Sequence, residues 1–146
     1  FSKRQHLQSN IDSLRIAFKL EKENRKASAG ERLLMMQYSG FGGLKFILNP
    51  VENAIDSNHW RKTEQYLFPL TQELHKLLKE NTVDPKQYSL YVDSMRNSVL
   101  TAFYTPPAII SALADTLKEN GLKVNRMLEP SAGSGSFIEA FNTSFG

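Results

Sequence analysis

The chain has 146 residues, about the size of one domain, and 40% of them are hydrophobic, which is enough to bury a core. It contains no cysteine, so disulfides and thiolate metal sites are excluded. Its three histidines, His6, His59 and His75, are scattered without the spacing of metal ligands. No apolar run reaches the length of a membrane span and no signal peptide is visible, so we expect a cytoplasmic protein.

The positive charge is concentrated at the amino-terminal end. The net charge is +3, and residues 1–32 alone contain eight cations and four acids, which leaves −1 for the remainder. Ile11, Leu14, Ala17 and Phe18 form an apolar stripe, so this segment is predicted to be a helix that docks on a core. Charged residues in such a helix most often form a solvent-exposed face, with ion pairs between residues of the same helix. The alternative is contact with DNA phosphates.

A glycine-rich segment, Gln37 to Lys45, follows this helix. Gly40, Gly42 and Gly43 favour a tight turn between helices, because glycine gives the backbone freedom that other residues lack. We expect these glycines to be structural and not catalytic.

Two further helices are predicted before residue 97. Leucines at helical spacing between Leu67 and Leu78 indicate the first, which ends near Glu80-Asn81. Asp84-Pro85 opens the second, which continues to about Arg96. Its Tyr88 and Tyr91 share a face with other apolar residues and are predicted to be core residues, since aromatic side chains bury large areas. Trp60 is likewise predicted to anchor the fold, although two neighbouring cations leave nucleic-acid contact open.

The carboxyl-terminal third predicts a helix, a short strand and a second helix. Thr105 is expected to cap the first helix with Pro106 at its first position, and Gly121 is expected to end it. Leu122 to Leu128 is predicted to be a short strand. Because no other strand is predicted in this chain, that strand is expected to be irregular, covered by helices, or paired with another copy.

After this strand the chain reads Glu129-Pro130-Ser131-Ala132-Gly133-Ser134-Gly135-Ser136-Phe137. The glycines can take positive φ, and the first amides of the following helix attract an anion. No lysine follows the last glycine, which excludes a P-loop, and Ile138 weakens a dinucleotide fingerprint. Glu129 favours a zwitterionic amino acid, with its ammonium on the carboxylate and its carboxylate on the amides. The methionine half of S-adenosylmethionine is such a group, and an ordinary strand-to-helix turn is the alternative.

Phe103-Tyr104-Thr105-Pro106-Pro107, a helix, and then Leu128 to Phe137 resemble the first two motifs of the amino DNA methyltransferases, mostly adenine N-6 methylases. The resemblance implies that Thr105 and the Tyr104 backbone meet the methionine carboxylate, and that Glu129 meets the ammonium. It implies that the turn lines S-adenosylmethionine through its main chain. The implied cofactor-binding residues are Tyr104, Thr105, Glu129, Pro130, Ala132, Gly133 and Gly135.

The catalytic Asn/Asp-Pro-Pro-Tyr/Phe motif of that family is absent, so no catalytic residue is predicted. The chain lacks an initial methionine, and only 19 residues follow Met127, too few for a complete doubly wound domain. We therefore expect a fragment that is inactive by itself and binds the cofactor weakly at most. The predicted architecture is mainly α: a helical region, residues 1–97, and the truncated start of an α/β Rossmann-like methyltransferase domain, residues 98–146.

Three functions remain open. The first is the front half of a DNA methyltransferase in restriction-modification or on a mobile element, with DNA as the partner of the full-length protein. The Gln37 to Lys45 segment is similar to one in helicase-methylase fusions of phages, plasmids and conjugative elements. The second is a non-catalytic helical DNA-binding or scaffolding module. The third is a methyltransferase acting on RNA or on a protein amide. No metal and no membrane partner is predicted, and the oligomeric state is left open.

Overall fold

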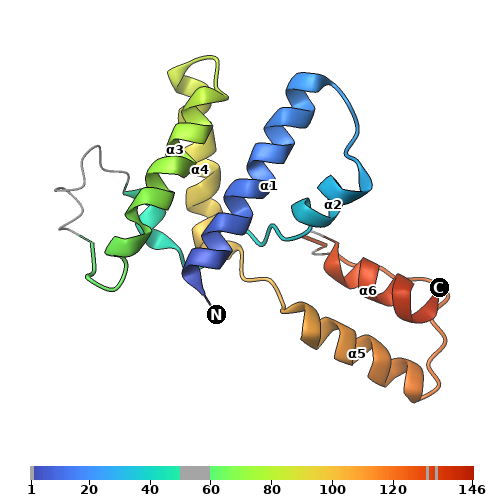
Figure 1. Cartoon of the computed structure of the whole chain (residues 1–146). Coiled ribbons are helices and arrows are strands. Elements are labelled where there is room, and N and C mark those ends of the chain that lie inside the picture. The colour runs from blue at the N-terminus through green and yellow to red at the C-terminus, as the bar shows by residue number, and fades with distance from the viewer. Residues whose placement is uncertain (1, 50–59, 131, 134) are drawn as a thin grey trace. The chain divides into compact units, whose positions relative to one another are not determined.

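The computed structural model describes residues 2–49, 60–130, 132–133 and 135–146. These residues form six α-helices and no strand: α1 (Lys3–Glu23), α2 (Ala29–Met35), α3 (Phe68–Glu80), α4 (Pro85–Thr101), α5 (Pro107–Glu119) and α6 (Ser136–Phe145), shown in Figure 1. The same residues also form the 3₁₀ helices η1 (Lys45–Leu48) and η3 (Gln65–Leu67). The mainly α prediction is confirmed. None of the described helices is both long and apolar enough to cross a bilayer.

The chain divides into two compact units, one ending at Phe103 and the other running from Tyr104 to Gly146. We call them the first and the second unit. The last turn of α4, which continues five residues beyond the predicted end at Arg96, belongs to the first unit. This extension has a packing reason, because Val99 continues the buried side of α4 that begins with Met95.

The first unit is built on α1, α3 and α4, which contribute most of one hydrophobic core (Figure 1). Leu7, Ile11 and Leu74 are fully buried at its centre. The predicted start of α4 is confirmed, since the Asp84 side chain accepts a hydrogen bond from the Gln87 amide at 2.7 Å. The predicted end of α3 at Glu80-Asn81 is also confirmed.

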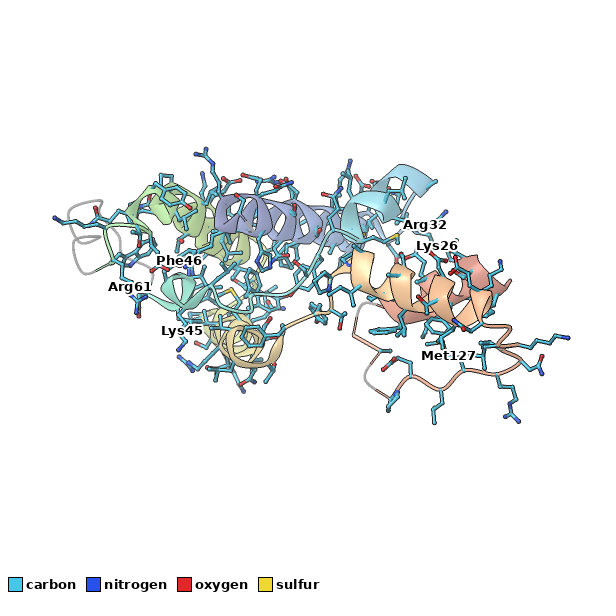
Figure 2. The ribbon with its side chains drawn as sticks, turned by 90° about the horizontal axis from the view of Figure 1, so that it is seen from below. Lys26, Arg32, Lys45, Phe46, Arg61 and Met127 are labelled. Carbon is cyan, nitrogen blue, oxygen red and sulfur yellow. The ribbon has the colours of Figure 1, made fainter. Side chains whose placement is uncertain are left out.

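Trp60 anchors the first unit, as predicted. Its ring lies 5.5 Å from the Phe46 ring and 5.6 Å from the Phe68 ring, and only 7% of the residue is exposed. Lys45 and Arg61, which Figure 2 labels together with Phe46, are exposed. Burial of Trp60 leaves the neighbouring cations, and not the indole, to meet solvent. The prediction that Tyr88 and Tyr91 are core residues is also confirmed, because both pack against the core cluster.

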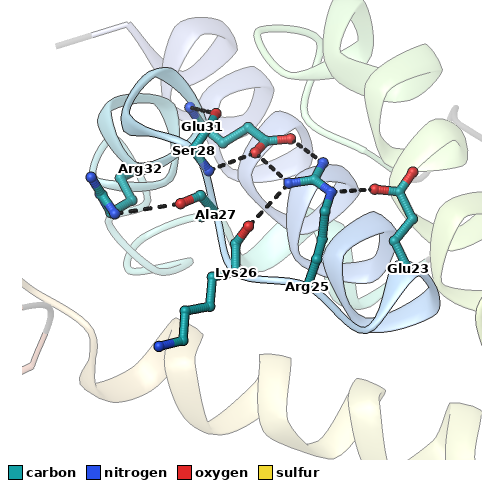
Figure 3. Close-up of polar contacts among 7 residues, drawn as sticks. All are labelled: Glu23, Arg25, Lys26, Ala27, Ser28, Glu31 and Arg32. Atoms are coloured by element: carbon teal, nitrogen blue, oxygen red, sulfur yellow. Dashed lines mark hydrogen bonds and ion pairs between the residues drawn. The ribbon is translucent and has the colours of Figure 1, made fainter.

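An ion-pair network holds the connection between α1 and α2 (Figure 3). Arg25 donates to Glu23 at 2.6 Å and to both carboxylate oxygens of Glu31 at 2.7 and 2.8 Å. Ser28 and Glu31 also exchange hydrogen bonds in a capping box that starts α2. The Arg25 guanidinium and the Ser28 donors hold the pKa of Glu31 well below its usual range. Several of the amino-terminal charges are thus paired at the surface.

The glycine segment forms the predicted tight turn, and helices α1 and α4 both form hydrogen bonds to it. The Gly40 carbonyl accepts hydrogen bonds from the side chains of His6 and Asn10 on α1. On the α4 side, the Phe41 amide donates to the Ser98 hydroxyl at 2.9 Å. Gly42 admits no side chain, because a Cβ there would overlap the Ala102 carbonyl oxygen. The segment from Gln37 to Lys45 is therefore a structural clasp between α1 and α4, a contact that the predicted tight turn did not include.

Candidate functional site

The candidate site lies in the second unit, where the segments that precede two helices come to the same end. In Figure 1, α5 and α6 run in the same direction, and residues 121–130 return the chain from the end of α5 toward the start of α6. The helices pack together, and the Ser144 hydroxyl donates to Asp115 at 3.0 Å across the pair. Tyr104 and Thr105, which precede α5, therefore lie at the same end of the pair as the Gly133-Gly135 turn, which precedes α6.

The start of α5 corrects the predicted role of Thr105. The N-cap is Pro106, and no side chain among the described residues caps the helix. The reason is the second proline: a residue that precedes proline is disfavoured in the helical region, and Pro106 accordingly has φ −56° and ψ 137°. The helix begins one residue later than predicted, at Pro107. The hydroxyl of Thr105 lies on an exposed residue just before the helix and not at its cap.

The end of α5 is as predicted. Asn120 is the C-cap, and Gly121 takes the left-handed conformation with φ 78°. The Leu122 amide then donates to the Leu117 carbonyl at 3.1 Å, which completes the stop of the helix.

The predicted strand from Leu122 to Leu128 is wrong for this chain as a regular element, since residues 122–130 are irregular. The described part of the chain offers no second strand with which to form a ladder, and strand geometry depends on such a partner. The expectation that an isolated strand becomes irregular is confirmed. Leu128 is 89% exposed and Met127, labelled in Figure 2, is 40% exposed. The segment thus spans the length of α5 without burying its apolar side chains.

The glycine turn has the backbone conformation that the sequence predicted. Gly133 and Gly135 have φ of 53° and 82°, in the left-handed region that favours glycine. The Gly135 amide donates to the Ala132 carbonyl at 2.7 Å, which closes the turn. Nothing lies within 4 Å of the position of a Cβ on Gly135. Glycine is favoured at position 135 because of its positive φ, and the space above the turn is open.

The turn leads directly into α6, whose N-cap is Gly135. A glycine has no side chain with which to bond the first amides of the helix. The amino-terminal end of α6 therefore places the positive end of the helix dipole beside the turn. Such an end attracts a carboxylate or phosphate.

The remaining predicted residues lie around this turn. Glu129 is half-buried at the end of the return segment, and Pro130 and Ala132 are exposed. Tyr104 is 44% exposed. The second unit thus brings an acidic side chain, a glycine turn and the segment before α5 to one end of the helix pair. Residues 131 and 134 lie outside the described residues.

Sequence reasoning missed one buried polar site in the first unit. His75, treated as one of three scattered histidines, is only 4% exposed, and its Nε2 donates to the Ile47 carbonyl at 2.7 Å. The Tyr88 hydroxyl donates to Nδ1 at 2.7 Å, which fixes the neutral tautomer because a carbonyl can only accept. Burial lowers the pKa of His75 and raises the pKa of Tyr88. The position of His75 between Leu74 and Leu78 was the signal, because it shares their buried face.

No protein-family model, no curated protein and no solved structure matches this chain significantly.

Proposed function

We propose that this chain is the amino-terminal part of a DNA methyltransferase that transfers the methyl group of S-adenosylmethionine to the exocyclic amine of adenine. One observation carries the proposal. The turn at Gly133 and Gly135, both left-handed, leads into a helix whose N-cap is glycine, at the same end of the α5–α6 pair as Thr105. The finer fold assignment, the start of an α/β Rossmann-like domain, belongs to the same proposal.

The proposed cofactor contacts follow from charge. The carboxylate of the methionine half lies against the first amides of α6 and near Thr105, where the helix dipole favours negative charge. Its ammonium pairs with Glu129, the acidic side chain that leads into the turn. Pro130, Ala132 and Gly133 contribute main chain and shape, and Gly135 leaves room for close approach. Tyr104 contributes its backbone.

This chain is proposed to hold the cofactor and not to catalyse the transfer. Methyl transfer requires the target nitrogen in line with the sulfonium, so catalysis depends on positioning. The Asn/Asp-Pro-Pro-Tyr/Phe motif that holds a flipped base is absent from the sequence. We therefore expect residues 1–146 to bind S-adenosylmethionine weakly and to transfer no methyl group to DNA.

The direct test is titration of S-adenosylmethionine into the isotope-labelled chain, followed by amide NMR shifts. We expect saturable shifts at Thr105, Glu129, Gly133 and Gly135. Replacing Glu129 by alanine is expected to weaken binding by about 1–3 kcal/mol, since it removes a charge-assisted hydrogen bond. Glu119→Ala is the matched control, because Glu119 is an exposed acid at the opposite end of α5. If the two variants bind S-adenosylmethionine with equal affinity, Glu129 does not contact the cofactor.

A second candidate function, a helical DNA-binding module, is supported by one observation on α1. Arg4, Arg15, Lys19 and Lys22 fall on one stripe of the helix, at spacings of eleven, four and three residues. Arg15 pairs with Asp12 and Glu73. The other three are exposed and make no ion pair with the described residues. DNA affinity with a steep salt dependence that survives Glu129→Ala and falls in Lys19→Ala/Lys22→Ala would favour this module.

A further inference from the structure

A half-open pocket lies inside the first unit, between α1, α4 and the glycine turn, and encloses about 150 Å³. Four aromatic residues line it: Phe18 on α1, Tyr38 and Phe41 around the glycine turn, and Tyr91 on α4. They form two ring pairs, Phe18–Tyr91 at 5.8 Å and Tyr38–Phe41 at 6.1 Å between centroids. Pockets for small molecules have this character, an apolar lining with a few placed polar groups.

Two serine hydroxyls of the pocket lining, those of Ser94 and Ser98, come from α4. The Ser98 hydroxyl accepts a hydrogen bond from the Phe41 amide at 2.9 Å, so its position is fixed while its own proton is left for another acceptor. One turn earlier, the Ser94 hydroxyl makes no hydrogen bond to the described residues. The two serine hydroxyls thus lie on the α4 side of an aromatic-lined space.

Charge and size narrow the class of ligand. Among the described residues, none of the side chains that line the pocket is charged. A charged ligand would lose its hydration without gaining a partner, which is costly, so the chemistry selects a neutral group. A cavity of about 150 Å³ admits a single aromatic ring in an engineered protein. Because this pocket is open on one side, it accommodates one or two fused rings. Aromatic rings favour a flat ligand, which they contact by offset stacking or edge to face.

We propose that this pocket binds a neutral, planar heteroaromatic group that accepts a hydrogen bond from Ser94. The proposal does not depend on the cofactor site, because every lining residue belongs to the first unit. The clasp also contributes to the pocket, because its hydrogen bonds to α1 and α4 hold Tyr38 and Phe41 in the pocket lining.

Free adenine is the probe, because it is flat, neutral at pH 7 and carries ring nitrogens that accept hydrogen bonds. It is titrated into the isotope-labelled 146-residue chain, and amide shifts are followed. We expect saturable shifts confined to residues around Tyr38, Phe41, Tyr91, Ser94 and Ser98, with a dissociation constant on the order of 1 mM or tighter.

Two variants at Ser94 test the assignment. Ser94→Phe fills the pocket from an exposed position on α4 and is expected to weaken binding at least tenfold, and Ser94→Ala, which removes only the hydroxyl, a few-fold. Ser89→Phe is the control, because Ser89 is exposed on the same helix and does not line the pocket. The proposal is overturned if adenine shifts are absent or lie elsewhere. It is also overturned if Ser94→Phe binds adenine as Ser89→Phe does, or if benzene binds there and adenine does not.

Discussion

The two units of this chain differ in how many of their apolar residues they bury. Among its described residues, the first unit buries fourteen hydrophobic residues in one cluster contributed by helices, 3₁₀ turns and the glycine clasp. In the second unit, Ile110 and Ala114 are the only described hydrophobic residues that are buried. Seven of its large apolar residues are exposed: Tyr104, Ile109, Leu113, Leu122, Met127, Leu128 and Ile138.

The two units therefore differ in what fixes their structure: local backbone preferences in the second unit and burial in the first. In the second unit, Pro107, Gly121, Gly133 and Gly135 set the ends of elements through their own backbone preferences, which need no distant contacts. In the first unit, the positions of the elements are fixed by burial, which needs residues far apart in sequence. A unit of about 40 residues with little buried area is marginal by itself. We therefore expect the first unit to unfold cooperatively and the second to contribute little to global stability.

The largest effect is expected from matched truncations in the two units. Leu74→Ala removes a fully buried side chain from the first core and should lower the free energy of unfolding by about 2–5 kcal/mol. Leu113→Ala, at a position 44% exposed in α5, should change it by less than about 0.5 kcal/mol. Denaturant unfolding monitored by Trp60 fluorescence, together with circular dichroism, measures both. Similar losses for the two variants would contradict the division into a packed and a weakly packed unit.

Two glycines sharpen the comparison within the first unit. Gly42→Ala forces a Cβ against the Ala102 carbonyl and should lower the free energy of unfolding by about 1–3 kcal/mol. Gly30→Ala, in α2, places its Cβ in open space and should raise stability by up to about 1 kcal/mol, because alanine favours a helix. The denaturation midpoints of the two variants should move in opposite directions. A neutral Gly42→Ala would mean that the clasp and α4 are not in close contact.

The smallest effect is a pH dependence that only the first unit should show. Burial lowers the pKa of His75 in the folded chain, so the unfolded chain binds the additional proton first as the pH falls. Stability is therefore complete above about pH 6.5, the ordinary pKa of histidine, and declines as the pH falls from there toward the folded pKa. The pKa of Glu31 is also lowered, so its contribution to stability is lost in a separate pH range, below its usual pKa of 4.5.

Denaturation midpoints between pH 7.5 and 5 measure this decline. His75→Gln removes the titrating group and should flatten the dependence, while its stability at pH 7.5 falls because the hydrogen bonds to Ile47 and Tyr88 are altered. The hydrogen-exchange protection factors of the α6 amides, from which the intrinsic pH dependence of exchange has been removed, should change little over the same range. An equal slope in the variant would assign the pH dependence to another group.

Sequence patterns predicted a large part of the helical fold. The starts of α4 and α6 and the ends of α3 and α5 follow from capping residues, prolines and glycines, because these act on their nearest neighbours. Helix α2 was not predicted, although Ser28 and Glu31 stand at the spacing of a capping box. The error at Thr105 has the same local origin, since two consecutive prolines move the cap to Pro106.

By itself, the sequence determined the local geometry of the candidate site: a glycine turn with positive φ, an acidic residue before it, and a helix whose first amides follow it. Only the tertiary structure decided that His75 is buried and neutral, that Ser98 holds the glycine clasp, and that four aromatic residues surround one pocket. The physical reason is the distance along the chain over which each kind of interaction acts. Backbone preferences act within a few residues, whereas burial and cavities arise from side chains that meet only when distant helices pack.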